Sequence, residues 1–487
     1  MARTERDLLG EMELPDDVLY GVQTERARRN FPVSGRPARP EIVQALALVK
    51  KACALANAQT GHLDSAIAEA IGRAADEVAA GEHASQFVVD ALQGGAGTST
   101  HMNVNEVIAR RASLLSGRSI DPLAHVNLHQ STNDAYATAV RVAAIRALQR
   151  LEPAVLALQQ ACQEKEREFA GVVKLGRTEL RDAVPVTLGR EFGAWAAALS
   201  RDRWRLSKGV ERLRVVNLGG TAVGTGIGAP RDYIFLAVEK LRDVTGLGLA
   251  RADNLIDATQ NLDAFSEASG LLRAHAVNLI KIARDLRLMA SGPEGGMGEI
   301  ELPALQPGSS IMPGKINPVM PEMVMQVGFR VMACDYEINL VVMSGELELN
   351  AFLPLLADAL LESLSLLEKA DQLFADRCIR GVVARPERCR ALMERSREIA
   401  TALIPVIGHE RAVELAKHMA EKSCSIREAC AALGILSPAR LDELQTLVFS
   451  GCGSAERHDL AGRGRSHAEQ GSHIGQLRAV LQRSHGD

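Results

Sequence analysis

Hydrogen-bonding residues gather at three places in a chain that is otherwise rich in apolar residues. The first is the stretch 94–106, GGAGTSTHMNVNE, where glycines free backbone N–H groups beside the hydroxyls of Thr98, Ser99 and Thr100. Such groups can bind an anion at a helix start, but Ser or Thr before a helix often only caps it. The neighbouring His101 is likewise open to a structural or a binding role.

The second place is the stretch 125–134, HVNLHQSTND, in which eight of ten residues can hydrogen-bond. Ser131, Thr132 and Asn133 come where a long helix is expected to begin. A helix N-terminus lined in this way attracts anions, and a simple cap needs only one such residue. This stretch therefore favours binding over capping.

The third place is the stretch 291–318, a long irregular connection between two expected helices. Loops of this length are usually lids or binding loops. Ser309 offers a hydroxyl, Lys315 a cation and Asn317 an amide, which together suit a carboxylate. A phosphate loop is excluded because Ile316 follows Lys315, so the GxxxxGK[ST] spacing is absent. The Gly-rich stretch 219–228 lacks GxGxxG and predicts a turn between helices.

The elements that must position these groups are expected to be long helices. Aromatic residues make up only 3% of the chain, and Ala and Leu are abundant. In 350–376 polar residues recur every three or four positions, which leaves most of a helix apolar and predicts burial among other helices. Comparable helices are expected at 136–169, 185–216, 257–290 and 318–343, with Pro185 and Pro318 in first turns. Short strands or hairpins are possible around 171–177 and 219–228.

The fold class that follows is mainly all-α, with a bundle of long helices at its centre. We expect an N-terminal domain over 1–135, a central helical bundle over 136–384 and a small helical domain over 385–450. The segment 451–487, rich in Gly, Ser, His and Arg, is expected to be a flexible tail.

Composition excludes several classes of function. The 56 Lys and Arg against 60 Asp and Glu leave no basic surface for nucleic acid. No apolar run of about 18 residues or signal peptide is visible, so neither a membrane span nor secretion is expected. Eight cysteines without a CxxC pair predict reduced thiols in the cytoplasm. No HExxH motif or Cys/His cluster predicts a metal site, and no residue cluster suggests an organic cofactor.

Five stretches resemble motifs of the aspartase/fumarase superfamily, in the same order along the chain. They are GTSTHMNVNE, HVNLHQSTNDAYAT, GRTELRDAVPVTLGREF, GTAVGTGIGAP and GSSIMPGKINPVMPE. The resemblance runs from about Asp7 to Leu447. The PVMPE ending and the QST triplet are most similar to the aspartate ammonia-lyase branch.

The resemblance implies a three-domain protomer in a homotetramer whose core holds about twenty helices. It implies active sites shared between three subunits and a small amino or dicarboxylic acid as substrate. The implied reaction is the reversible anti elimination of ammonia from L-aspartate to give fumarate, through an aci-carboxylate intermediate.

The resemblance also assigns roles to residues of this chain. Ser309 would be the general base, acting as an alkoxide whose pKa is lowered by backbone N–H groups and Lys315. Lys315 and Asn317 would hold one substrate carboxylate. The remaining substrate contacts are expected from Thr98, Ser99, Thr100, His101, Ser131, Thr132, Asn133 and Thr178.

The chain departs from the superfamily pattern at three positions. Glu179 stands where relatives carry His or Gln, His101 replaces Asn, and Glu346 replaces Gln. Glu322 is the expected partner of Glu179 in catalysis, and two adjacent carboxyls would share a proton. Glu179 could instead contact a cationic substrate group or pair with Arg181.

These departures leave alternatives open. One is a fumarate hydratase, and another is a lyase for a modified aspartate or substituted succinate. A third is a catalytically idle homologue with a structural or regulatory role.

Overall fold

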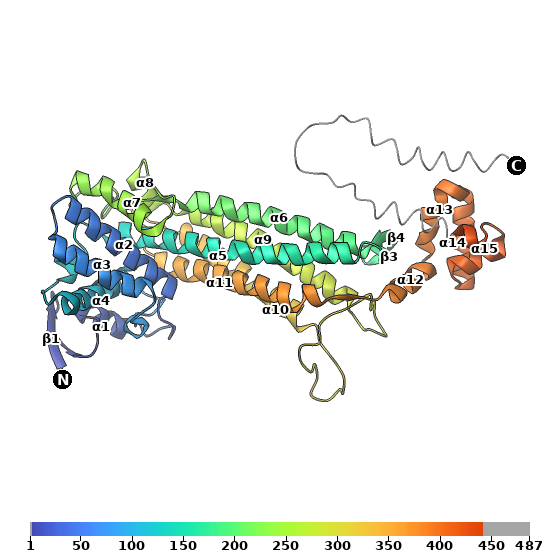
Figure 1. Ribbon diagram of the computed structural model, residues 1–487, viewed down its shortest axis with the longest axis horizontal. Helices are drawn as coiled ribbons and strands as arrows, with labels where there is room; N and C mark the ends of the chain where they lie inside the picture. The colour runs from blue at the N-terminus through green and yellow to red at the C-terminus, as the bar shows by residue number, and fades with distance from the viewer. Residues whose placement is uncertain (1, 442–487) are drawn as a thin grey trace. The chain divides into compact units, whose positions relative to one another are not determined.

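The structure is a computed structural model that describes residues 2–441, and the chain divides into two compact units. The first unit comprises Met1–Gln159, Ala197–Arg284 and Val319–Asp376. The second comprises Gln160–Ala196, Asp285–Pro318 and Arg377–Asp487. Figure 1 shows the order of the elements along the chain.

Helices dominate the first unit. Its elements, named where they begin, are β1 (Ala2–Asp7), β2 (Gly10–Pro15), α1 (Val22–Asn30), α2 (Pro40–Gln59), α3 (Ser65–Ala79), a 3-10 turn (Ala84–Gln86), α4 (Thr98–Ser116), a π-helical turn (Pro122–Val126), α5 (Thr132–Glu168), β5 (Val215–Val216), α7 (Arg231–Thr245), β6 (Ala250–Arg251), α8 (Leu255–Gln260), α9 (Asp263–Met289), α10 (Val319–Val342) and α11 (Leu353–Arg377). β1 and β2 form an antiparallel hairpin, and β5 pairs in parallel with β6.

The elements that begin in the second unit are β3 (Val173–Thr178), β4 (Arg181–Thr187), α6 (Leu188–Leu213), β7 (Ile300–Glu301), two 3-10 turns (Ile379–Gly381 and Arg397–Ile399), β8 (Val383–Ala384), α12 (Pro386–Arg395), α13 (Ala400–Ile407), α14 (His409–Lys422) and α15 (Ile426–Leu433). β3 pairs with β4, and β7 with β8, both antiparallel. Apolar side chains of β3 and of α12 to α15 form a small core that includes Leu175, Leu403 and Leu415.

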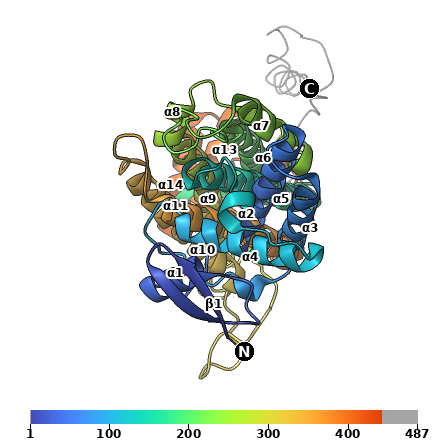
Figure 2. The same cartoon turned by 90° about the vertical axis from the view of Figure 1, so that its left-hand side faces the viewer.

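Close helix packing in the first unit depends on small residues. Stretches of α5, α6, α9, α10 and α11 run side by side there (Figures 1 and 2). A Cβ added at Gly209 of α6 would lie 3.5 Å from Leu148 of α5 and 3.8 Å from Leu271 of α9. A Cβ at Gly328 of α10 would lie 2.5 Å from Ile280 of α9. Because bulk at Gly328 would separate the helices, a bundle built this way has little room for aromatic rings.

The mainly helical fold confirms the sequence prediction. α5, α10 and α11 begin and end within four residues of the predicted ranges. The predicted helix 257–290 is two helices, because α8 ends at Gln260 and α9 begins at Asp263. Among residues 2–441, no helix has both the length and the apolar character needed to cross a bilayer.

Two local predictions were wrong. Pro185 does not begin a helix: it lies in β4 opposite Leu175, and α6 starts only after Thr187, whose hydroxyl accepts the N–H of Arg190 at 3.3 Å. The pairing with β3 thus delays the helix by three residues. The hairpin β1–β2 was not expected, although its exposure alternates along Ala2–Asp7 as a half-buried strand requires.

Other predictions are not tested by the described residues. The expected tail, 451–487, lies outside them, and the three domain boundaries stay predictions. The seven cysteines within residues 2–441 form no disulfide.

A buried charge cluster joins three helices of the bundle. His275 of α9 lies between Asp202 of α6 and Asp371 of α11, with its Nδ1 2.9 Å from Asp202 and its Nε2 2.8 Å from Asp371. All three side chains are almost fully buried. Burial by itself would lower the pKa of His275, but the two carboxylates raise it to about 10. The imidazolium is therefore the cation that Asp371 shares with Asp202, which is also paired with Arg205 at 2.5 Å.

We predict that His275→Gln destabilises the folded protein. Removing one partner of a buried charge cluster costs about 3–5 kcal/mol, because Asp371 is left without its cation while Asp202 keeps Arg205. The folded pKa of about 10 exceeds the unfolded value of 6.5. The stabilisation is therefore fully present below pH 6.5 and is lost as the pH rises toward 10.

Urea unfolding at fixed protein concentration measures this difference at several pH values. The half-exposed His62, whose Nε2 lies 3.4 Å from Asp232, provides the matched control His62→Gln, with an expected effect of about 0.5 kcal/mol or less. A His275→Gln variant as stable as the control near neutral pH would contradict the assignment.

Candidate active site

The first unit brings two of the predicted anion-binding stretches together. α4 begins at Thr98 directly after Gly97, which has a left-handed φ of 97°. A Cβ at Gly97 would lie 2.8 Å from the ring of Tyr136, so only glycine fits this approach to α5. The hydroxyl oxygens of Thr98 and Thr132, the latter at the start of α5, are 3.2 Å apart.

The residues that follow Thr98 differ in how far their side chains are exposed to solvent. Ser99 is partly exposed, whereas Thr100 and His101 are buried. The Thr100 hydroxyl and N–H are both engaged by the side-chain amide of Gln93, at 2.8–3.0 Å. Thr98 and Ser99 are therefore the residues at this helix start whose side chains reach the surface.

Burial places His101 beneath Thr132 rather than on the surface. Its Nδ1 lies 2.8 Å from the Thr132 hydroxyl, and its Nε2 contacts the buried ammonium of Lys50 on α2. Burial and the charge of Lys50 hold the pKa of His101 well below its ordinary value, so the ring is neutral. His101 can influence a ligand only through Thr132.

The start of α5 is fixed by its own side chains. Asp134 Oδ1 accepts the N–H of Ser131 at 3.0 Å, and the Ser131 hydroxyl accepts the N–H of Asn133 at 3.2 Å. Ser131 is thus a helix cap, as the simpler reading allowed, and it remains partly exposed.

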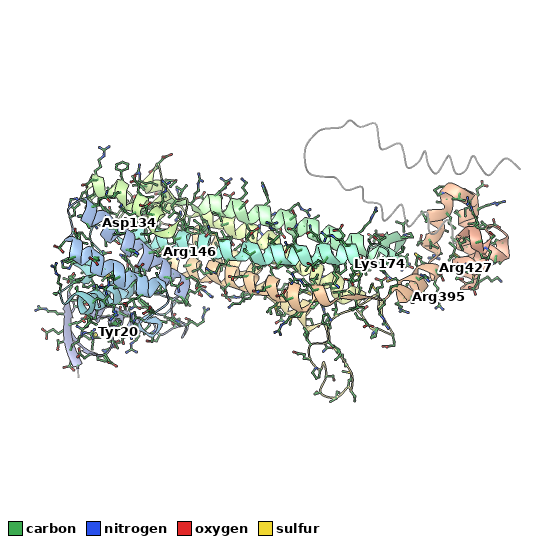
Figure 3. The ribbon with its side chains drawn as sticks, in the orientation of Figure 1. Tyr20, Asp134, Arg146, Lys174, Arg395 and Arg427 are labelled. Carbon is green, nitrogen blue, oxygen red and sulfur yellow. The ribbon has the colours of Figure 1, made fainter. Side chains whose placement is uncertain are left out.

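Asp134 also ties this helix start to the Gly-rich turn 219–228. Its Oδ2 accepts the N–H groups of Gly219 and Thr221 at 3.0 and 3.1 Å, and Asn133 Nδ2 donates to Ala222 at 2.7 Å. Figure 3 labels Asp134 at this point of the chain. The turn is irregular, as predicted, and its role in the structure is to brace the start of α5.

The second unit contains the serine loop, residues 308–317. The Ser309 hydroxyl oxygen accepts two backbone N–H groups, from Ile311 at 3.2 Å and from Met312 at 2.9 Å. Two such donors favour the charged form of an oxygen acid and so lower its pKa. Ser309 is half-buried, and the Lys315 side chain in the same loop is exposed.

A backbone clamp closes the serine loop. Gly308 N–H donates to the Lys315 carbonyl at 2.7 Å, and Asn317 Nδ2 donates to the Gly308 carbonyl at 2.7 Å. A Cβ on Gly308 would lie 2.8 Å from both Asn317 N and the Lys315 carbonyl. The Asn317 amide therefore helps to shape the loop, and glycine is required at position 308.

The tip of the β3–β4 hairpin carries the other predicted residues of the second unit. Thr178 pairs with Arg181, and the turn between them places Glu179 at φ 55° and Leu180 at φ 61°. Residues other than Gly, Asn and Asp rarely adopt this conformation, and strain of this kind gathers at functional sites. Within residues 2–441 the Glu179 carboxylate makes no ion pair, including with Arg181.

The hairpin is supported by charges below its tip. Glu299 is fully buried between Lys174 at 3.1 Å and Arg177 at 2.7 Å. Lys174, labelled in Figure 3, also donates to Glu191 at 2.9 Å. These pairs connect β3 with the segment that leads to the serine loop.

Glu322 and Glu346 belong to the first unit. Glu322 lies in the first turn of α10, and Glu346 is exposed between α10 and α11. Glu179 belongs to the second unit, so its predicted pairing with Glu322 stays a prediction.

Two surface pockets formed by the described residues lie away from the predicted site. One in the first unit is lined in part by Arg36, Val78 and Phe87. The other, in the second unit, is lined in part by Glu294 and Arg385. Neither includes a predicted site residue.

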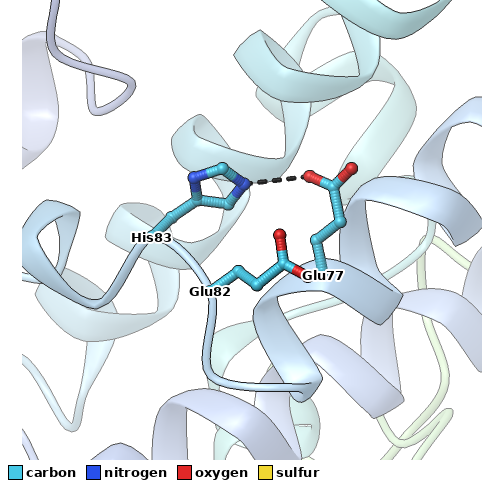
Figure 4. A group of neighbouring side chains, drawn as sticks. All are labelled: Glu77, Glu82 and His83. Atoms are coloured by element: carbon cyan, nitrogen blue, oxygen red, sulfur yellow. Dashed lines mark hydrogen bonds and ion pairs between the residues drawn. The ribbon is translucent and has the colours of Figure 1, made fainter.

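Glu77, Glu82 and His83 form an acidic group whose possible ligand atoms lie within 4.8 Å of one another (Figure 4). Glu77 accepts two bonds from Arg111, at 2.6 and 2.9 Å, and lies 2.9 Å from His83 Nε2. Arg111 is the main cause that lowers the pKa of Glu77 to about 2. A cation here would have to displace a guanidinium, so the contacts are those of an ion-paired cluster.

Sequence reasoning missed the residues that support the site from below. Lys50 and Asn217 are fully buried, and Asn217 donates to the Asn133 carbonyl at 3.0 Å. A lysine within the apolar run ALALVKKACALA was the available signal for Lys50.

We predict that Gly308→Ala opens the serine loop. The added Cβ displaces Asn317 and Lys315, so the Gly308 N–H loses its partner and exchanges faster with solvent. Hydrogen exchange of peptides covering 305–320, followed by mass spectrometry, measures this change. The matched control is Gly295→Ala, where a Cβ meets nothing within 4 Å. Equal exchange in the two variants would show that the clamp does not hold the loop.

Comparisons with known proteins match most of this chain. A lyase family model matches residues 10–333, and a model of the fumarase C C-terminus matches residues 399–447. The aspartate ammonia-lyase of Bacillus subtilis is 44% identical over 90% of this chain and 94% of its own length. That of Escherichia coli is 43% identical over 91% of this chain and 94% of its own length.

Solved structures agree with these matches. The fumarate lyase:delta crystallin of Brucella melitensis is 46% identical, with a TM-score of 0.89 over 93% of this chain and all of that chain. The class II fumarase of Schistosoma mansoni is 32% identical, with a TM-score of 0.86 over 91% of this chain and 98% of that chain. The predicted resemblance is confirmed: the chain belongs to the aspartase/fumarase superfamily and is an enzyme of the carbon–nitrogen lyase class.

Proposed function

We propose that this protein catalyses the reversible anti elimination of ammonia from L-aspartate to give fumarate. The observation that carries the proposal is the Ser309 hydroxyl, whose oxygen accepts two backbone N–H groups in a loop that also contains Lys315 and Asn317. The relatives named aspartate ammonia-lyase, at 43–46% identity, support aspartate as the substrate.

The reaction begins with removal of a proton from Cβ of aspartate. This proton is weakly acidic, so the base must be strong and the resulting dianionic aci-carboxylate must be stabilised. Ser309 as an alkoxide takes the proton, and the Ile311 and Met312 N–H groups stabilise that alkoxide. The exposed Lys315 ammonium and Asn317 bind the carboxylate on which charge develops.

The elimination is completed when the electron pair of the aci-carboxylate forms the double bond. As the double bond forms, the Cα–N bond breaks, its electron pair leaves with the nitrogen, and the protonated amino group departs as ammonia. Thr98, Ser99, Ser131, Thr132, Asn133 and Thr178 bind the other carboxylate and the amino group, with Thr100 and His101 behind them. Closing the serine loop over the substrate would exclude water and strengthen these contacts.

We place the active site where three subunits of a homotetramer meet. The Thr98–Thr132 pair belongs to one unit and Ser309 to the other. α10 and the residue directly after it expose an apolar stripe at helical spacing, formed by Phe329, Met332, Tyr336, Leu340 and Met343. Tyr336 is 69% exposed and Met343 76%, which supports a further copy of this chain as the covering partner. We place the enzyme in the cytoplasm, because its cysteines form no disulfide within residues 2–441.

We predict that Ser309→Ala folds and assembles like the wild type but loses turnover of aspartate. Absorbance of the fumarate formed, from aspartate and from malate in parallel, measures the rate and separates an ammonia-lyase from a fumarate hydratase. A variant rate within about tenfold of wild type, or about 1.4 kcal/mol, would overturn Ser309 as the base. Turnover of malate instead of aspartate would favour the hydratase, and inactivity on a panel of substituted succinates would favour an idle homologue.

Glu179 favours a second candidate, a lyase for a modified aspartate. Its exposed carboxylate at the strained hairpin tip would repel a dicarboxylate unless the carboxyl shares a proton with Glu322 or faces a cationic group of the substrate.

We predict that Glu179→Gln lowers the KM for aspartate about fivefold, because removing a like charge near 4 Å is worth about 1 kcal/mol in a solvated site. Steady-state kinetics measure this change, with the exposed Glu294→Gln as the control in the same unit. Unchanged kinetics would place Glu179 outside the site, and a loss of activity would support its catalytic role with Glu322.

A further inference from the structure

Lys50 is a fully buried cation directly beneath the start of α5. Its ammonium has three hydrogen-bonding neighbours: Asn127 Oδ1 at 3.0 Å, Gln130 Oε1 at 2.7 Å and His101 Nε2. An ammonium has three N–H donors and no acceptor, so three acceptors satisfy it fully.

The two amides around Lys50 can only be acceptors toward it. Gln130 Nε2 donates to the carbonyls of Val126 and Leu128, at 3.0 and 3.2 Å. Asn127 Nδ2 donates to the Gln130 carbonyl at 3.2 Å. Because the NH₂ groups are engaged elsewhere, both amide oxygens must face Lys50 in either of its protonation states.

The His101 ring is therefore the neighbour that responds when Lys50 changes its charge. A charged Lys50 donates to Nε2, so the neutral ring carries its proton on Nδ1 and donates to the Thr132 hydroxyl at 2.8 Å. A neutral Lys50 has two N–H groups, which the amides take, and a lone pair that accepts from Nε2–H. Nδ1 then lacks a proton and accepts from Thr132.

The Thr132 hydroxyl must follow the ring. When it accepts from His101, its own hydrogen points away from the ring, toward the Thr98 oxygen at 3.2 Å or a ligand. The Thr98 hydroxyl already donates to the Gly95 carbonyl at 2.7 Å, so it can accept but does not compete as a donor. When Thr132 donates to His101 instead, it presents only lone pairs to a ligand.

We infer that Lys50 and His101 are positioning residues that turn the Thr132 hydroxyl: outward as a donor to a substrate carboxylate when Lys50 is charged, and inward when Lys50 is neutral. The part of this inference that concerns the carboxylate rests on the proposed function. The part that concerns the ring and the hydroxyl does not, since it follows from the hydrogen bonds of the single chain.

The charge of Lys50 changes near neutral pH. Burial lowers the pKa of Lys50 to about 7, against the opposing effects of Cys53 on the same helix and Asp134 on α5. Burial also raises the pKa of Cys53 to about 12 and that of Tyr233 on α7, which contacts Cys53, well above its ordinary value. Burial raises the pKa of Asp134 as well, partly offset by the backbone N–H groups that it accepts.

The His101 ring can be observed directly. Solid-state NMR of the full-length protein, labelled with ¹⁵N in its histidine rings, distinguishes a protonated from an unprotonated ring nitrogen. The His101 signals are identified by their loss in His101→Asn. We expect the proton on Nδ1 at about pH 5 and on Nε2 at about pH 9, two units either side of the Lys50 pKa of about 7. In Lys50→Met the change of tautomer disappears.

Calorimetric binding of succinate reports the effect on a ligand without requiring turnover. Succinate has both carboxylates of the proposed substrate and no amino group that titrates. We expect its affinity to fall about tenfold between about pH 6 and about pH 8, the effect of losing one hydrogen bond to a charged group. His101→Asn should bind succinate with little pH dependence, whereas the control His62→Asn should keep the wild-type dependence.

The outcomes separate this inference from the proposed function. One His101 tautomer at both pH values, or an unchanged pH dependence of succinate binding in His101→Asn, overturns the inference. Because the wild-type spectra, assigned with His101→Asn, give the tautomer at both pH values, a Lys50→Met variant that fails to fold does not weaken the test. A tautomer change in a protein that does not deaminate aspartate would leave the hydrogen-bond chain standing and overturn the proposed function alone.

Discussion

The buried carboxylate of Asp134 is the interaction on which the first half of the site depends. It accepts N–H groups from Ser131, Gly219 and Thr221, and so joins the first turn of α5 to a turn more than 80 residues away in sequence. A buried carboxylate is tolerable only with such donors, and a helix start offers unpaired N–H groups. The same hydrogen bonds therefore stabilise the carboxylate, define the N-terminus of α5 and hold Thr132 in place.

Other buried charges in the chain obey the same constraint. Glu106 accepts the N–H groups of Gly21, Gln23 and Thr24 at the start of α1, at 2.8–3.1 Å. His275 supplies the cation for two buried carboxylates in the bundle, and Glu299 is held by Lys174 and Arg177 in the second unit. Each cluster crosses between elements, so it fixes their register where apolar contacts alone would allow them to slide.

Helix positions were predictable from the sequence, because a stripe of polar residues every three or four positions is a local signal. The polar stretches were also predictable from a local signal. Three consecutive hydrogen-bonding residues, Ser131, Thr132 and Asn133, interrupt the apolar pattern of a buried helix. What could not be predicted depends on contacts distant in sequence. Pro185 is in a strand because β3 lies beside it. The role of Lys50 depends on His101, Asn127 and Gln130, which are 51 to 80 residues away in sequence. Side-chain burial separates Thr98 from Thr100, although both are threonines two positions apart.

The resemblance implies Asn at position 101, where this chain has His, and the two side chains differ in what they can do. An asparagine amide has a fixed donor and a fixed acceptor, so it passes a hydrogen bond in one direction for each orientation of its side chain. An imidazole exchanges donor and acceptor by moving one proton, without moving a heavy atom. Because His101 is buried between Lys50 and Thr132, its effect on catalysis would come from the direction of one hydroxyl and not from a new contact with substrate. Glu179 would act differently from His101, because its exposed carboxylate would contact the substrate directly. Under these proposals the choice of substrate would depend on Glu179, and the response to pH on Lys50 acting through His101.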